Sequence, residues 1–374
     1  MGLVITPQVE IDKYFESPAL SQSTLKKLLT GIDGYLKSNK QEKELYYTEK
    51  GHFIIGSAVD TILTGENGEF DKQYYVSELE KKPSDVEMSI IQMVFDSISK
   101  NDFQIYDLRS YETFIDYAIT QHNWQSNWKL ETKINKIIDI GTDYFEDLKK
   151  GFGKQMITIN DKKLIDDIVI SLRSNSVTSK YFDRNAINRS KNIEVRYQVL
   201  IYFLYKDVNC KALLDIVVIE TLPDGSITIQ IIDLKTMAGN TLHFLTNLKK
   251  FRYDSQASFY TNAITTDITT FEPVYSANKV TLLPFLFIVE SNTNPGQPLV
   301  YVADNEILEI GKKGKEEVKI GNDIIKYAIK GFDELLDTYI YQSENDWLQE
   351  KVIIDNNGVL HINWNGIVDE HNNR

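Results

Sequence analysis

Two apolar, β-branched segments on either side of a Pro223-Asp224-Gly225 turn constrain the fold more than any other feature of this chain. The first segment runs from residue 211 to residue 220, and the second runs from residue 227 to residue 236. Two such runs separated by a short turn sequence are typical of a β-hairpin. We therefore expect two paired antiparallel strands in this part of the chain.

Two aspartates occupy mirror positions in the expected hairpin. Folding about residue 224 places Asp215 directly across from Asp233. Directly opposed side chains have Cβ atoms about 4.5–5.5 Å apart, which is close enough for two carboxylates to hold one divalent ion. Because unpaired carboxylates repel each other, such a pair usually shares a cation or a proton. The pattern therefore predicts a metal site at Asp215 and Asp233.

A lysine joins this pair, because the two-residue period of a strand puts Lys235 on the same face as Asp233. Phosphodiester hydrolysis needs a metal that polarises the phosphate and lowers the pKa of a bound water, and Asp oxygens suit Mg²⁺ or Mn²⁺. A lysine beside the metal can position the water or offset charge that develops in the transition state. Asp215, Asp233 and Lys235 are therefore candidate catalytic residues, and the main-chain carbonyl of Leu234 is a candidate further metal ligand.

The tripeptide of an acidic residue, any residue and Lys is a weak signal alone, because it occurs six times in this chain. Five of these tripeptides lie in polar or helical surroundings, where an exposed ion pair is the natural interpretation. Only Asp233-Leu234-Lys235 ends an apolar strand and has an Asp opposite it. This context favours a catalytic role over a surface strand edge.

The segment after Lys235 predicts an amphipathic helix over residues 241–261. Arg252, Gln256 and Tyr260 recur every four residues and so share one face of that helix, with Lys249 near it. A Gln and a Tyr so placed can hydrogen-bond a nucleotide or a metal-bound phosphate, while Arg252 grips the DNA backbone. The alternative is an ordinary polar stripe on a surface helix.

The composition is that of an ordinary globular protein, with 374 residues of which 42% are hydrophobic and 25% charged. The single cysteine, Cys210, excludes internal disulfides and four-cysteine zinc or iron–sulfur sites. The apolar runs have the length of strands, and residues 1–8 lack the basic and long apolar regions of a secretory signal. We therefore expect a cytoplasmic protein without a membrane segment.

The formal net charge of −13 argues against a protein that coats nucleic acid without specificity. A local basic groove can still bind DNA on an acidic body. The candidate clusters are residues 26–27, 249–252 and 312–315. Each cluster taken alone is better explained as a solvated helix or loop face.

Periodicity and composition predict the remaining elements in outline. They are an extended leader over 1–20, a helix that opens with capping hydroxyls at Ser21 and Ser23, a helix over 53–63 stopped by Gly65, a mainly helical stretch over 66–185, strands over 193–205, 282–290 and 299–302, a turn over 206–209, and a helix over 322–341. Without an internal repeat or a linker composition, we expect one domain over 1–374. It comprises a mainly helical part (1–185), a catalytic sheet with helices (186–345) and a tail (346–374). Strands flanked by helices indicate an α/β or α+β class.

These motifs resemble those of the PD-(D/E)XK nuclease superfamily. Asp215, Asp233-x-Lys235 and Gln256-x-x-x-Tyr260 look like its motif II, its motif III and its Gln-x-x-x-Tyr motif. Ser21-x-Ser23 with the following Leu25, and the segment from Gly56 to Asp60, resemble the opening segments of the RecE (exonuclease VIII) nuclease domain. The late strands at 287–290 and 299–302 also fit that domain. The similarity covers roughly residues 20–340.

The resemblance implies a restriction-endonuclease-like core, with a central mixed sheet flanked by helices. It implies a Mg²⁺-dependent exodeoxyribonuclease that acts on linear duplex ends, in which Ser21, Ser23, Gln256 and Tyr260 are candidate DNA-binding residues. It further implies a toroidal oligomer that works beside a single-strand annealing protein in phage recombination, inside a bacterial host cell.

Asp60 departs from the family pattern, because that position is typically a metal-binding His. A carboxylate there keeps an oxygen-donor metal site feasible, and the alternative is an Asp on a helix surface. Glu194, at the start of the strand before the hairpin, is a further candidate metal ligand. The two rival functions are a non-catalytic DNA-binding or scaffold protein with the nuclease fold, and a nuclease that cuts internally.

Overall fold

The chain forms two compact units in the computed structural model, which describes residues 2–32, 35–36, 51–99, 105–266, 279–315, 318–320, 323–325, 329–344, 361–363 and 366–368. The first unit contains Met1–Glu49, Leu63–Glu66 and Ile170–Arg374, and the second contains Lys50–Ile62 and Asn67–Val169. The sequence predicted one domain over 1–374. Two of the boundaries between the units fall inside helices α4 (Gly51–Thr64) and α9 (Ile159–Ser174), so no loop composition marks them.

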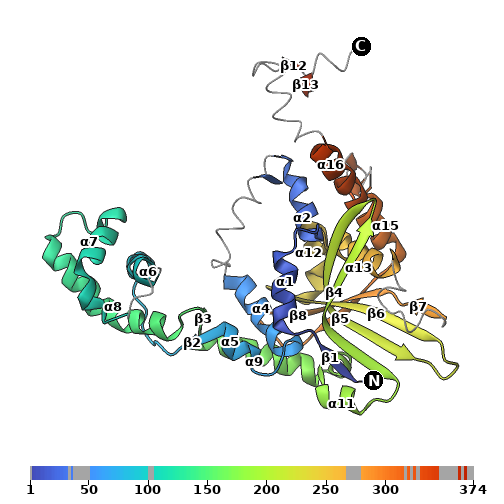
Figure 1. The fold of residues 1–374 in the computed structure, drawn as a ribbon, viewed down its shortest axis with the longest axis horizontal. Coiled ribbons are helices and arrows are strands. Elements are labelled where there is room, and N and C mark those ends of the chain that lie inside the picture. The colour runs from blue at the N-terminus through green and yellow to red at the C-terminus, as the bar shows by residue number, and fades with distance from the viewer. Residues whose placement is uncertain are drawn as a thin grey trace. The chain divides into compact units, whose positions relative to one another are not determined.

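The first unit is built on a seven-stranded mixed sheet with the order β1-β4-β5-β6-β8-β9, in which β7 also pairs with β6 (Figure 1). The strands are β1 (Leu3–Ile5), β4 (Ile193–Tyr205), β5 (Val208–Thr221), β6 (Ile227–Met237), β7 (Val280–Leu282), β8 (Phe285–Ser291) and β9 (Leu299–Ala303). β4, β5 and β6 form an antiparallel meander, and β6 pairs with β8 in parallel. The central mixed sheet flanked by helices confirms the predicted fold class.

The predicted hairpin is present, with β5 and β6 joined by a turn in which Gly225 has a φ of 82°. β4 has the predicted bounds. The turn after β4 is shorter than predicted, because Lys206 and Asp207 both take positive φ angles. Two such residues make the tight hairpin turn that matches the twist of the strands, so β5 begins at Val208.

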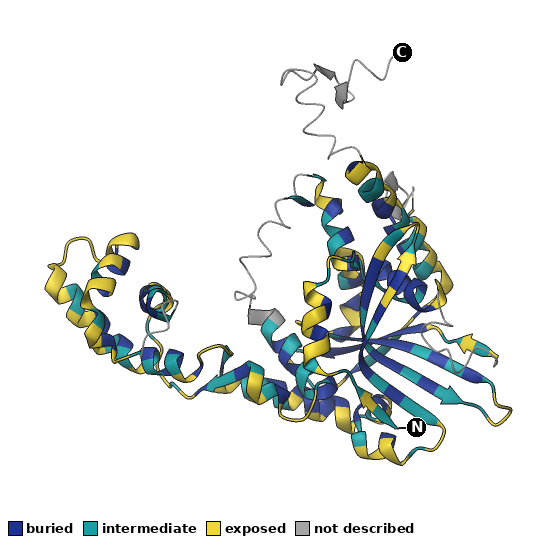
Figure 2. Ribbon diagram, in the orientation of Figure 1, coloured by how far each residue is buried: buried dark blue, intermediate teal, exposed yellow. Residues whose placement is uncertain are grey.

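Helices cover this sheet and carry the main core. They are α1 (Gln8–Glu16), α2 (Gln22–Lys26), η1 (Lys27–Thr30), α10 (Ser179–Phe182), α11 (Arg184–Arg189), η3 (Thr241–His243), α12 (Phe244–Phe251), α13 (Tyr253–Thr266), α15 (Asn305–Lys313) and α16 (Phe332–Glu344). α13 packs against β4 and β5 on one side and against α15 on another, and α2 contacts α13 and α16. Figure 2 shows the middle strands of the sheet as largely buried.

Three predicted elements differ from the structure. The leader over 1–20 contains strand β1, which pairs in parallel with β4, and helix α1. In place of one helix over 322–341, β10 (Val318–Ile320) pairs with β11 (Asp323–Ile325), and α16 begins only after Gly331. Within the predicted tail, β12 (His361–Asn363) pairs with β13 (Gly366–Val368), and the other tail residues from 346 on lie outside the described residues.

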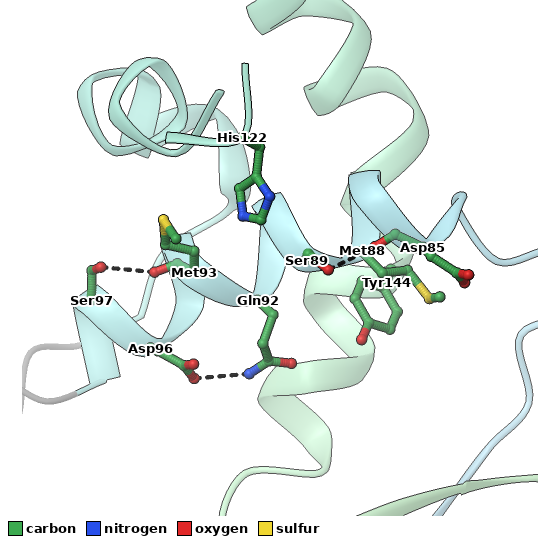
Figure 3. A pocket seen from close by; sticks show the side chains of 9 residues that line it. All are labelled: Asp85, Met88, Ser89, Gln92, Met93, Asp96, Ser97, His122 and Tyr144. Carbon is green, nitrogen blue, oxygen red and sulfur yellow. Dashed lines mark hydrogen bonds between the residues drawn. The ribbon is translucent and has the colours of Figure 1, made fainter. Parts of the chain in front are cut away.

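The second unit is mainly helical, as predicted for residues 66–185. Besides parts of α4 and α9 it contains α5 (Glu69–Gln73), β2 (Tyr74–Ser77), α6 (Asp85–Ser99), η2 (Leu108–Tyr111), α7 (Glu112–Gln121), α8 (Leu130–Lys150) and β3 (Gln155–Thr158). Ile90, Ile91, Ile137 and Phe145 are fully buried between its helices. An open depression on this unit is lined by Met88, Met93, His122, Tyr144 and neighbouring polar residues (Figure 3). The hairpin aspartates do not line it.

Candidate active site

Asp215 and Asp233 lie where the ladder between β5 and β6 ends. The last pair of that ladder is Ile216 with Ile232, so the next residues in the same register are Asp215 and Asp233. The main-chain N–H of Leu234 donates a hydrogen bond of 2.8 Å to Oδ2 of Asp215. The Leu234 N–H lies beyond the last pair of the β5–β6 ladder and binds the Asp215 carboxylate instead. This bond holds the Asp215 carboxylate next to Asp233, as the sequence predicted.

A local twist of the sheet accompanies Asp215. Along β5 the residues that join the main core change from even positions, the last being Leu214, to odd positions, the first being Val217. On the neighbouring strand, the register places Gln198 opposite Asp215, and Gln198 has a φ of 54°. A left-handed residue inside a strand is strained by about 1–2 kcal/mol and is found mostly at functional sites. The strained backbone therefore lies directly opposite the aspartate that the sequence singles out.

Lys235 contacts Asp233 in an ion pair that is almost wholly buried. Asp233 is 1% exposed, and its Oδ2 meets the Nζ of Lys235. The Lys235 ammonium also lies over the ring of Tyr253, 4.9 Å from the ring centroid. Such a contact stabilises the charged form of a lysine. Lys235 is therefore held in place from two sides.

The electrostatics of this pair keep Lys235 charged. Burial raises the pKa of Asp233, and the Lys235 charge lowers it again, with a net rise. Burial alone lowers the pKa of Lys235, but the carboxylates of Asp233 and Asp215 outweigh it and raise that pKa well above its ordinary value. The Lys235 side chain is thus an ammonium near neutral pH and cannot serve there as a proton acceptor.

The Asp233 carboxylate has the character of a metal ligand. Both of its oxygens are buried; Oδ2 meets the Lys235 ammonium, whereas Oδ1 has no hydrogen-bond partner among the described residues. A buried carboxylate oxygen without a hydrogen bond is costly, and a cation bound to it compensates for that cost. In the described part of the chain, no group of three His, Cys, Asp or Glu side chains is placed to hold a metal. This donor set suits Mg²⁺, which often takes one or two carboxylates and keeps several waters or substrate oxygens.

The predicted helix over 241–261 is interrupted at Arg252. α12 ends at Phe251, Arg252 takes a left-handed φ of 58°, and α13 begins at Tyr253. The Arg252 guanidinium forms two hydrogen bonds of 3.0 Å with the buried carboxylate of Asp254. Arg252 therefore does not share a continuous helix with Gln256 and is already paired, which does not support the predicted grip on the DNA backbone.

Gln256 and Tyr260 lie one turn apart on α13, as predicted. The Gln256 amide donates to the Tyr260 hydroxyl at 3.2 Å. Burial raises the pKa of Tyr260 far above its ordinary value, and the charges of Asp233 and Asp215 raise it further. Tyr260 therefore stays protonated near the two aspartates, and substrate binding by Gln256 and Tyr260 stays a prediction.

The other predicted DNA contacts lie on helix surfaces and helix ends. Lys249 is exposed near the end of α12. Ser21 caps α2: its Oγ accepts from the main-chain N–H of Thr24 at 3.2 Å and bonds Oγ of Ser23 at 2.9 Å. The predicted capping role is confirmed for Ser21, whereas Ser23 lies within α2, and DNA binding by Lys249, Ser21 and Ser23 stays a prediction.

Glu194 is not brought to the aspartate pair. The register places it opposite Ile219, four residues along β5 from Asp215, which corresponds to about 13 Å. Its carboxylate is bound instead by the Arg196 guanidinium. The strand register therefore does not support a role for Glu194 in the metal site. The sequence did not specify the register of β4 against β5.

Asp60 and Leu234 stay predictions as metal ligands. Asp60 is half-buried on α4 and belongs to the second compact unit. Leu234 contributes its N–H to the site through Asp215, whereas a role for its carbonyl is an expectation from the sequence. His243, expected at the surface near a helix start, is exposed in η3.

The sequence did not single out two residues of the site. Tyr253, whose ring lies under the Lys235 ammonium, could not be placed there because the sequence did not predict the break between α12 and α13. Lys26 was named only as part of a basic cluster, yet its Nζ donates to the carbonyl of Phe251 at 3.3 Å. The presence of a basic residue in the helix after Ser21 was the only signal for Lys26.

Comparisons with known proteins add little to this geometry. No protein-family model matches the chain, and no curated protein matches it. Among solved structures, the chain is similar to a crystal structure from Eubacterium rectale described as a “Putative exonuclease”, with 14% identity and a TM-score of 0.28. The match covers 62% of this chain and 80% of that chain. Similarity this low leaves the function to be argued from the site.

Among the described helices, none is long and apolar enough to cross a membrane.

Proposed function

We propose that this chain is a metal-dependent deoxyribonuclease that hydrolyses phosphodiester bonds at Asp215, Asp233 and Lys235. The observation that carries the proposal is the buried Asp233 carboxylate, whose Oδ2 meets the Lys235 ammonium and whose Oδ1 has no hydrogen-bond partner among the described residues, while Asp215 lies beside it. The PD-(D/E)XK resemblance of the sequence supports the same chemistry. Buried polar atoms are in large majority hydrogen-bonded, so the unpartnered Oδ1 of Asp233 supports a ligand at this position.

The roles follow from the contacts. Asp215 and Asp233 would hold a Mg²⁺ or Mn²⁺ ion, which supplies phosphate polarisation and a bound water of lowered pKa. The Lys235 ammonium, kept charged by the two carboxylates, donates hydrogen bonds to an attacking water or to a phosphate oxygen. Tyr260, also kept protonated, and Gln256 hydrogen-bond the substrate beside the pair.

The mode of cleavage that we favour is exonucleolytic, on the ends of linear duplex DNA. The support for this mode is the resemblance of the sequence to the RecE nuclease domain. The same resemblance favours Mg²⁺ as the metal, a ring-shaped homo-oligomer, and a single-strand annealing protein as the partner. A bacterial cytoplasm is the matching compartment.

A gel assay tests the function and separates the two rivals. Purified protein is incubated with Mg²⁺ and either supercoiled circular DNA or the same DNA made linear. We expect loss of the linear DNA from its ends and an intact circle, and Asp233→Asn is expected to leave both unchanged. Conversion of the circle to nicked or linear forms indicates an internal cutter. A retarded but undegraded band with both DNAs indicates a non-catalytic binding protein and contradicts the proposal.

A further inference from the structure

Lys26 belongs to the same helix junction as the candidate active site. At the end of α2 its Nζ bonds the carbonyl of Phe251, the last residue of α12. Arg252 follows immediately, and the next residue, Tyr253, carries the ring under the Lys235 ammonium. The rings of Phe251 and Tyr253 lie 5.7 Å apart. Three cations, those of Lys26, Arg252 and Lys235, thus gather around one short segment.

The three cations differ in their partners. Lys235 is paired with Asp233, and Arg252 is paired with Asp254. Within the described part of the chain, Lys26 has a neutral carbonyl as its hydrogen-bond acceptor and no carboxylate within ion-pair distance. Burial lowers the pKa of Lys26, and the charges of Lys235 and Arg252 lower it further. A half-buried cation beside other cations is stabilised when an anion binds to it.

We propose that the Lys26 ammonium binds a backbone phosphate of the DNA substrate next to the bond that is cleaved. The inference rests on the proposed nuclease function and assigns to this site a phosphate contact that the sequence motifs do not include. An ammonium has three N–H donors, of which the Phe251 carbonyl occupies one, so two donors remain for phosphate oxygens. The contact also places the phosphate near Lys235, through the shared Phe251–Tyr253 segment.

A purely structural lysine would act differently. If Lys26 serves only to tie α2 to the carbonyl of Phe251, its replacement alters thermal stability and leaves the salt dependence of DNA binding unchanged. A phosphate contact instead contributes to the number of counterions released, so its loss lowers the salt slope. The slope therefore separates the two roles.

The experiment measures duplex binding with Ca²⁺ in place of Mg²⁺, over a series of salt concentrations, for wild type, Lys26→Met and Lys26→Arg. Lys13→Met, which removes an exposed lysine of α1 paired with Glu10, is the control. We expect Lys26→Met to lower the slope of log K against log salt by about 0.9 and to weaken binding about tenfold at 0.1 M salt. Lys26→Arg is expected to keep the wild-type slope, and so is Lys13→Met.

A second measurement locates the phosphate. Duplexes that carry one neutral methylphosphonate at successive positions are compared between wild type and Lys26→Met. The inference predicts one position at which the methylphosphonate weakens wild-type binding but does not weaken Lys26→Met further. Additive losses at every position, or an unchanged slope for Lys26→Met while wild type digests DNA, overturn the Lys26 contact alone. If wild type neither binds nor digests DNA, the proposed function fails first.

Discussion

Among the single residues of the site, the buried charges of Asp233 and Lys235 lower the stability of the fold. Removing a carboxylate and an ammonium from water is unfavourable by several kcal/mol for each ion, and the attraction between them offsets this only with good geometry and further hydrogen bonds. Asp233 has the Lys235 ammonium at Oδ2, but its buried Oδ1 has no hydrogen-bond partner among the described residues. The arrangement is therefore better explained by a ligand that binds there than by the stability of the fold.

The first prediction concerns the Asp233–Lys235 pair. Lys235→Met leaves a buried carboxylate without its cation, so we expect a loss of about 3 kcal/mol of stability in the absence of metal, together with loss of DNA hydrolysis. Because a bound Mg²⁺ compensates the same carboxylate, Mg²⁺ should raise the melting temperature of this variant more than that of wild type. Differential scanning fluorimetry with and without Mg²⁺ measures this difference.

Arg252→Met is the control for this experiment, because it breaks the neighbouring ion pair with Asp254. Its melting temperature should fall, while its increment on adding Mg²⁺ stays at the wild-type value. If Mg²⁺ raises the melting temperature of wild type and of Lys235→Met by the same amount, Asp233 does not bind the metal in the way that this prediction requires.

The second prediction concerns Cys210, which is buried in β5. Burial raises the pKa of its thiol to about 12 from an ordinary value of 9.0, and the reactive species is the thiolate. We expect alkylation by iodoacetamide at pH 8 to be far slower in the native protein than in a cysteine peptide, and to reach the peptide rate in denaturant. Native alkylation at the peptide rate would contradict this burial.

The raised pKa of Cys210 makes the stability of the folded protein depend on pH. The folded state holds the thiol proton more tightly than the unfolded state, so this contribution is fully present below pH 9 and is lost as the pH rises towards 12. Cys210→Ala should therefore show a weaker loss of stability over that range, measured by urea unfolding at fixed pH values.

At the scale of elements, α13 is positioned by a close crossing with α15. An ideal Cβ at Gly311 would lie 2.1 Å from the carbonyl oxygen of Asp254 and 2.3 Å from Oγ of Ser258. The Ser258 hydroxyl also donates to the carbonyl of Leu308 on α15, at 2.6 Å. α13 carries Tyr253, Gln256 and Tyr260, so this crossing fixes one wall of the site.

The third prediction follows from this crossing. Helix propensity alone favours Gly311→Ala by about 1 kcal/mol, but the added methyl group collides with backbone and we expect a net loss of about 1–3 kcal/mol. Urea unfolding measures whether Gly311→Ala is less or more stable than wild type. Glu309→Ala, at an exposed position of the same helix, should stay within about 0.5 kcal/mol of wild type. A stabilised Gly311→Ala variant would contradict the close packing of the two helices.

The same elements show how far the sequence alone could lead. The β5–β6 hairpin was predictable, because β-branched alternation and a Pro-Asp-Gly turn specify both the strands and their register. The break at Arg252 was not, because a non-glycine residue in left-handed backbone has no local signal and depends on the bond to Asp254. The strained Gln198 opposite Asp215 is invisible in the sequence for the same reason.

At the scale of the whole molecule, the sequence predicted the mixed sheet and its flanking helices but not the division into two compact units. The second unit is inserted in the chain of the first, with boundaries inside α4 and α9. Helical periodicity continues through such boundaries, so no composition change marks them. The pairing of β1 with β4 joins strands nearly 200 residues apart, which local patterns cannot indicate.

The proposed chemistry requires that Asp215 and Asp233 together hold a divalent cation. Calorimetric titration with Mn²⁺ of wild type, Asp215→Asn and Asp233→Asn tests it most directly, with Asp254→Asn as a control that removes another buried carboxylate of the same unit. We expect measurable binding by wild type and by the control, and at least about tenfold weaker binding, or about 1.4 kcal/mol, for each hairpin variant. Wild-type affinity in both hairpin variants would contradict the claim.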